Sequence, residues 1–227
     1  VATLGRSYRA IEDGFCRILA RLPFPILEIH PDNGSEFLND HLVRFWKEKV
    51  KDVILSRSRP FQKNDNRFVE QKNSTLVRAY LGSARFDTAQ QTNAINQLYQ
   101  KMWLYYNFFQ PVMRLVEKTT IPSPPDQGQP LRIKRRFDRA RTPLGRLSET
   151  EAISEEQKHE LRTLRDQINP RQLRREINQL LDHIFLLPGP VPGQTEDVFD
   201  TLFTPLDDQK GEGIPVTLSF DSITTLR

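Results

Sequence analysis

The stretch of sequence that decides the fold is Ile26-Leu-Glu-Ile-His-Pro-Asp-Asn-Gly-Ser-Glu-Phe37. It opens with a short apolar run bounded by turn-forming residues, which predicts a buried strand that leads directly to Asp32. Ser35 is placed to cap a following helix. The apolar residues of that helix recur at helical spacing: Leu38, Leu42, Phe45, Trp46 and Val50. Residues 52–56 predict a second strand, and this strand–helix–strand order is typical of an α/β layer with parallel neighbours.

Helices are expected on both sides of this unit. From Ser7 to Leu22 the apolar residues recur with the spacing of an amphipathic helix. After a polar loop at 57–66, residues 67–81 predict a second such helix, with Glu70 at the edge of its buried stripe. That stripe is expected to hold Val69, Leu76 and Tyr80. A longer helix is predicted over residues 89–109. Its buried face is expected to hold Ile95, Leu98, Tyr99, Met102, Tyr106 and Phe109.

The chain divides into four parts by composition. Residues 1–115 form the compact α/β unit, and residues 116–150 predict a Pro-rich and basic linker. Residues 151–187 predict a helical hairpin that opens with a capping box of Ser154 and Gln157. Residues 188–227 are rich in proline, glycine and acids, so we expect a mostly disordered acidic tail.

Length and composition limit the class of protein. The 227 residues carry 33 Lys+Arg against 29 Asp+Glu, a net charge of +4 that permits nucleic-acid binding without demanding it. One cysteine, Cys16, excludes a disulfide scaffold and a Cys-rich zinc site, and it is expected to be a packed apolar residue. No run approaches the roughly 18 apolar residues of a membrane span, so we expect a soluble, cytoplasmic protein without a membrane partner.

Two carboxylates, Asp32 and Glu70, stand 70 minus 32, or 38, positions apart. One follows a predicted strand and the other lies on a predicted helix, so both could face the same strand end. Carboxylate oxygens are the hard ligands that Mg²⁺ or Mn²⁺ prefers, and two such ions can clamp the attacking and leaving oxygens of a phosphoryl transfer. Taken alone, however, Asp32-Asn33-Gly34 is typical of a turn and Glu70 of a solvated helix residue.

Basic residues surround the two carboxylates in the sequence. Four cations are expected to neutralise the phosphates of a bound DNA strand: Lys63, Arg67, Lys72 and Arg78. Asn33 and Asn64 offer polar groups to the same strand. A second basic run lies between 132 and 146 and indicates either DNA contact through Arg135 and Arg136 or a solvated linker. The aromatic cluster at 105–109 indicates core packing rather than base stacking.

Three segments resemble the catalytic core of retroviral-type integrases and of the related bacterial insertion-sequence transposases. They are His30-Pro-Asp-Asn-Gly-Ser-Glu-Phe37, Ser58-Arg-Pro-Phe-Gln-Lys-Asn-Asp-Asn66 and Val69-Glu-Gln-Lys-Asn73, within a match over roughly residues 1–115. A later segment, Phe137-Asp-Arg-Ala-Arg-Thr-Pro-Leu144, looks like the region downstream of the core in such transposases.

The resemblance implies an RNase H-like α/β fold that carries out DNA integration or transposition as a magnesium-dependent DNA recombinase. It implies that Asp32 and Glu70 are the second and third catalytic acids and metal ligands. Its implied partners are DNA, as element ends and target, and further copies of the chain. It also implies a bacterial mobile element and a DNA-associated, cytoplasmic location.

The first acid of that family is expected on an opening strand upstream of Asp32, and none of Glu12, Asp13 and Glu28 fits that place. We therefore expect a core that lacks its first strand or strands, holds two of three ligands and is inactive alone. The competing hypothesis is a non-catalytic DNA-binding or interaction remnant of a transposase. An RNase H-like nuclease that acts on RNA is a third reading of the same residues.

Overall fold

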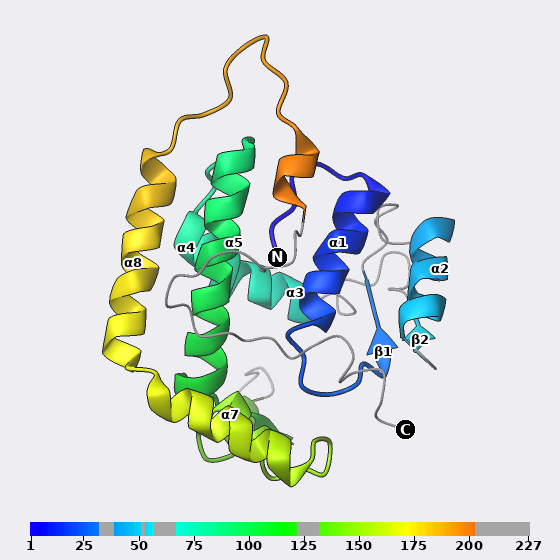
Figure 1. Ribbon diagram of the computed structural model, residues 1–227. Coiled ribbons are helices and arrows are strands. Elements are labelled where there is room, and N and C mark those ends of the chain that lie inside the picture. The colour runs from blue at the N-terminus through cyan, green and yellow to red at the C-terminus, as the bar shows by residue number, and fades with distance from the viewer. Residues whose placement is uncertain (32–38, 51–52, 57–66, 122–131, 203–227) are drawn as a thin grey trace, which may run out of the picture. The chain divides into compact units, whose positions relative to one another are not determined.

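The computed structural model describes residues 1–31, 39–50, 53–56, 67–121 and 132–202, and shows a mixed α/β chain that is mostly helical with small sheets (Figure 1). Two compact units divide it. Unit 1 comprises Val1–Gln100 and Arg175–Arg227, and unit 2 comprises Lys101–Arg174. The division does not follow the composition boundaries at 115, 150 and 187, because two long helices, α5 and α8, run through it.

Unit 1 contains the strand–helix–strand element predicted from the sequence. Strand β1 (Glu28–Ile29), helix α2 (Asp40–Lys49) and strand β2 (Ile54–Leu55) follow one another, and the two strands pair in parallel. The register places Glu28 opposite Ile54 and Ile29 opposite Leu55. Parallel neighbours joined by a helix are therefore confirmed, although each strand is shorter than its apolar run.

The N-cap of α2 is Asn39, not Ser35 as predicted. The Asn39 side chain accepts a hydrogen bond from the backbone N–H of Leu42 at 3.0 Å. Asparagine and serine are comparable N-cap residues, so the sequence offered two good candidates four positions apart. Ser35 itself lies outside the described residues.

An aromatic core holds α2 against the first helix, α1 (Tyr8–Leu19), which is capped by Ser7. Phe45 and Trp46 of α2 are buried with Leu19, and the Phe15 ring meets Trp46 edge to face at a centroid distance of 4.6 Å. The partly buried residues packed on this core are Phe15, Cys16, Ile26, Ile29, Val50 and Val53. The core thus contacts Ile29 of β1 and Val53, the residue before β2, and Cys16 is packed as expected. The prediction of a buried strand at 26–29 is only partly right, because Ile26 and Ile29 are partly buried whereas Leu27 is 75% exposed.

The helix predicted over 67–81 is interrupted by a π-helical segment. Helix α3 (Arg67–Lys72) passes into η2 (Asn73–Arg78) and then α4 (Ala79–Leu81), which ends at Gly82 with a φ of +63°. The predicted stripe is wrong at Val69, which is 55% exposed, and Leu81 is the residue that is buried. A π-helical turn bonds i to i+5, so residues before and after η2 do not keep one α-helical phase: Leu76 and Tyr80 are partly buried, whereas Val69 before η2 is exposed.

The longer predicted helix is α5 (Ala89–Leu104), continued by a second π-helical segment, η3 (Tyr105–Phe109). Ile95, Leu98 and Met102 are buried as predicted. After the π turn, which is closed by the Gln110 N–H on the Tyr105 carbonyl at 3.1 Å, Phe108 is buried instead of Phe109.

Part of the predicted acidic tail is ordered against unit 1. Helix α8 (Pro170–Leu186) is followed by a short 3₁₀ helix, η4 (Val198–Thr201). The Glu196 carboxylate accepts from the Ala89 N–H at 2.9 Å at the start of α5, and Asn93 Nδ2 donates to the Asp200 carbonyl at 3.1 Å. Residues 188–202 of the predicted tail thus contain a short helix and contact unit 1. Residues 203–227 lie outside the described part, so a mostly disordered tail stays a prediction.

Unit 2 contains an antiparallel hairpin within the segment predicted as a linker. Strands β3 (Leu115–Ile121) and β4 (Arg132–Phe137) pair, and helices α6 (Pro143–Leu147) and α7 (Glu155–Gln167) follow. Helix α7 opens with the predicted Ser154–Gln157 capping box. The prolines that suggested a linker fall within residues 122–131, outside the described residues.

A separate apolar core stabilises unit 2. Phe108, Leu144, Ile153 and Leu161 are its buried members. The partly buried residues around them are Trp103, Leu104, Phe109, Leu147, Leu164 and Ile168. Of the aromatic cluster at 105–109, Phe108 and Phe109 thus belong to the core, as the sequence indicates. Among the helices of the described residues, none is long and apolar enough to cross a membrane.

Candidate metal and nucleic-acid sites

The β1–β2 pair defines the strand edge from which the predicted metal site would be built. Because the strands are parallel, their carboxyl ends lie at the same edge, and Asp32 follows β1 by three positions in the sequence. Asp32 and Asn33 fall within residues 32–38, outside the described residues, as do Lys63 and Asn64 within 57–66.

Three polar side chains meet at the same edge, and sequence analysis considered only Glu28 among them, as a first acid that does not fit. The Ser56 hydroxyl donates to the Glu28 carboxylate, and Nδ1 of His30 lies 2.7 Å from Ser56 Oγ. An ionised carboxylate only accepts, so the imidazole Nδ1–H is the donor to the serine oxygen. The hydroxyl proton is directed at Glu28, so this group joins the two strand ends and is not arranged as a serine nucleophile with its base.

Glu70, the second predicted ligand, lies in α3 with an exposed side chain. Lys72 of α3 and Arg78 of η2 are exposed as well, whereas only the backbone of Arg67 is described. The side chains of Lys72 and Arg78 therefore face solvent and can contact an anionic ligand. Because the neighbouring Val69 is exposed too, the helix stripe at whose edge Glu70 was predicted is not buried at this turn.

The donor chemistry of this region fits a hard divalent cation. Asp32 and Glu70 would supply only carboxylate oxygens, which suit Mg²⁺ or Mn²⁺ and not a soft metal. Within the described ranges there is no cluster of three or more His, Cys, Asp or Glu side chains that could hold a metal ion. Because Asp32 is not among the described residues, that observation does not bear on the pair.

Arg135 and Arg136, the remaining predicted DNA contacts, lie in unit 2 on β4, and both are exposed. They are not equivalent. Arg136 Nε lies 3.0 Å from Glu117 Oε2 on the facing strand, whereas Arg135 lies opposite Lys118. The alternation of side chains along a strand sends these two arginines to opposite faces of the hairpin.

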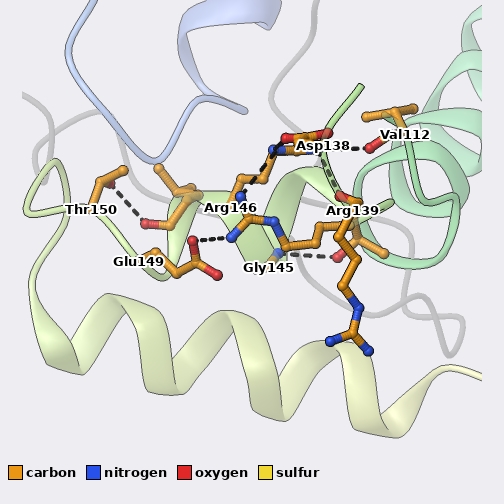
Figure 2. Close-up of polar contacts among 10 residues, drawn as sticks. Val112, Asp138, Arg139, Gly145, Arg146, Glu149 and Thr150 are labelled. Carbon is orange, nitrogen blue, oxygen red and sulfur yellow. Dashed lines mark hydrogen bonds and ion pairs between the residues drawn. The ribbon is translucent and has the colours of Figure 1, made fainter. Parts of the chain in front are cut away.

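One member of the basic run, Arg146, is an internal residue. It is 9% exposed, and Figure 2 shows its guanidinium directed at Asp138. Nη1 donates to Asp138 Oδ2 at 2.6 Å, and Nη2 donates to Oδ1 at 3.1 Å and to the Val112 carbonyl at 2.8 Å. Arg146 is therefore occupied inside unit 2 and belongs to no DNA-binding surface.

Asp138 completes this network at the open end of the hairpin. It also accepts from the Arg114 N–H at 2.7 Å, and the side-chain hydrogen bond from Arg146 lowers the pKa of Asp138 to about 2. Val112 and Arg141 exchange backbone hydrogen bonds at 2.9 and 3.2 Å beside it. The network joins the residues before β3 to those after β4.

Comparison with known proteins gives one informative similarity. The chain is 41% identical over 99 residues to an uncharacterized protein, y4rM, of Sinorhizobium fredii. The match covers 44% of this chain and 28% of that protein, so the chain spans well under two thirds of its relative. No protein-family model matches the chain, and no solved structure matches it.

Proposed function

We propose that the chain is part of a DNA recombinase of the integrase and transposase type, which performs integration or transposition by metal-dependent phosphoryl transfer. The observation that carries the proposal is the parallel β1–α2–β2 element. It has the Asp32 motif directly after its first strand and Glu70 on the helix that follows its second strand. An RNase H-like sheet places carboxylates at such positions, and the three quoted sequence segments agree with it.

In this proposal the chain's own residues bind and orient DNA around the two carboxylates. Asp32 and Glu70 would hold Mg²⁺, which supplies charge stabilisation at phosphate oxygens when it is bound. Lys72 and Arg78, both exposed near Glu70 in the sequence, would offset the charge of neighbouring phosphates. In this proposal the recombinase acts as an oligomer and works on bacterial DNA in the cytoplasm.

A second candidate function is non-catalytic DNA binding by a transposase remnant. The observation that favours it is the exposed basic hairpin of unit 2, which needs no metal to contact phosphates. The two candidates differ in one property, because only the recombinase requires Asp32 and Glu70 to share a metal ion.

Titration calorimetry with Mg²⁺ and Mn²⁺ tests the proposal. We expect the wild-type chain to bind the cation in the millimolar range, and both Asp32→Asn and Glu70→Gln to abolish that binding, because each removes one of two hard ligands. Glu160→Gln is the matched control, since Glu160 is an exposed helix glutamate of unit 2. Circular dichroism establishes that each variant is folded. Binding that survives either substitution, or a folded wild type that binds no cation, would leave only the DNA-binding candidate.

A further inference from the structure

The β3–β4 hairpin presents two different faces. The paired residues are Glu117 with Arg136, Lys118 with Arg135, Thr119 with Lys134 and Thr120 with Ile133, and a bulge separates them from the pair of Leu115 with Phe137. Paired residues share a face and successive residues alternate. We call one face the Arg135 face: Leu115, Lys118, Thr120, Ile133, Arg135 and Phe137. The opposite face, the Arg136 face, consists of Glu117, Thr119, Ile121, Arg132, Lys134 and Arg136, since Ile121 pairs with Arg132.

The hairpin is exposed along its whole described length. Every residue of β3 is exposed, and so is every side chain of β4 from Ile133 to Phe137. On the Arg135 face this includes three large apolar residues, Leu115, Ile133 and Phe137, which are 48%, 45% and 49% exposed. A two-stranded ribbon that buries neither face has little stability of its own, so its order depends on the Asp138–Arg146 network at its base.

The charges on the Arg135 face have no counter-charge among the described residues of the two strands. Lys118 and Arg135 lie directly opposite each other, and like charges at such positions repel. No acid shares their face among the described residues. On the other face, by contrast, Glu117 accepts from Arg136 at 3.0 Å and offsets its charge, and Lys134 and Arg132 are opposite Thr119 and Ile121, so no two cations are directly paired there. The Arg135 face is therefore the one that an external polyanion would relieve of repulsion.

The order of residues along this face favours DNA over an anionic membrane. The Lys118–Arg135 pair lies in the middle, with Leu115 and Phe137 on one side and Ile133 on the other. The apolar residues thus form no continuous patch that could enter a bilayer. An antiparallel two-stranded ribbon fits the major groove of B-DNA, and the six residues of β4, at about 3.4 Å each, extend over roughly 20 Å.

We propose that the Arg135 face of the hairpin binds double-stranded DNA, with Lys118 and Arg135 on phosphates and the apolar residues against the groove. The identity of the polyanion rests on the proposed function. The choice of face rests only on the register and the ion pair. The consequence is that Arg135 and Arg136, neighbours that the sequence treats as equal, differ in their effect on DNA affinity.

Fluorescence anisotropy of a labelled random-sequence duplex with the full chain tests this assignment. We expect the Lys118→Ala/Arg135→Ala variant to raise Kd at least about tenfold at low salt. It should also reduce the slope of log K against log salt by about 1.8, as expected for two lost phosphate contacts. Lys134→Ala/Arg136→Ala removes the same net charge from the opposite face and is the matched control. It should change Kd less than about threefold.

Equal losses in the two double variants, or no loss in either, would overturn the assignment, and so would a wild type that binds phosphatidylglycerol vesicles but not the duplex. Unchanged melting temperatures establish that the variants are folded. The cation titrations of Asp32→Asn and Glu70→Gln do not involve the hairpin. Face-independent DNA binding with an intact metal site would therefore refute this inference alone, whereas face-specific DNA binding without metal binding would refute the recombinase alone.

Discussion

Replacing Phe108 with alanine is expected to destabilise unit 2 by about 3–5 kcal/mol, the range for deleting a fully buried aromatic side chain. Phe108 is 4% exposed and packs with Leu144, Ile153 and Leu161. Its ring also meets Trp103 at a centroid distance of 5.7 Å in an edge-to-face arrangement. No other described aromatic residue of the unit is buried to this degree. Because a close-packed core relaxes only partly around a deleted ring, a cavity is expected to remain.

Phe109→Ala is the matched control for this effect. Phe109 is adjacent in sequence and only partly buried at the edge of the same core, so its loss should cost about 1 kcal/mol. Urea unfolding followed by Trp103 fluorescence in a Trp46→Phe background measures both variants, since Trp46 reports on unit 1. A larger loss for Phe109→Ala would mean that the helix continues without the π turn and that Phe109 faces the core.

The Phe108 and Phe109 pair shows where sequence periodicity stops being informative. Regular α-helical spacing places Ile95, Leu98 and Met102 correctly over two turns of α5. It then fails at the π-helical segment η3, because the wider turn shifts which residues face the core. No residue type in the sequence indicates such a turn. Across η2, likewise, Val69 and Leu81 lie on its two sides and do not share one buried face.

Long-range pairing explains most other differences between sequence and structure. The acids and basic residues of the candidate site can be read from motifs, because each motif is local. The Glu28–Ser56–His30 group is not local: it forms only when β1 and β2 align in parallel. Likewise, Pro-rich and basic composition predicts a linker, whereas the Glu117–Arg136 register makes two strands of it. Composition describes solvation and not pairing, so neither feature was accessible without the fold.

Arg146→Ala is expected to lower the melting temperature of unit 2 by several degrees at neutral pH. The guanidinium donates two hydrogen bonds to Asp138 and one to the Val112 carbonyl. Its removal therefore leaves the Asp138 carboxylate without its counter-charge and the Val112 carbonyl without this donor. Arg146→Lys should recover only part of the loss, because a single ammonium cannot make the bidentate contact. Thermal unfolding followed by circular dichroism measures the series. Arg146→Ala melting at the wild-type temperature would show that the network does not stabilise the hairpin.

The same network predicts a pH dependence of definite sign. The folded-state pKa of Asp138 is about 2, below the ordinary aspartate value of 3.8, because Arg146 and the Arg114 N–H stabilise the carboxylate. A carboxylate with a depressed pKa contributes stability that is complete above its unfolded pKa and is lost as protons bind. The free energy of unfolding should therefore fall between about pH 4 and pH 2, and Asp138→Asn should remove this component. Urea titrations at several pH values distinguish the two proteins, and identical slopes in that window would assign the acid sensitivity to other carboxylates.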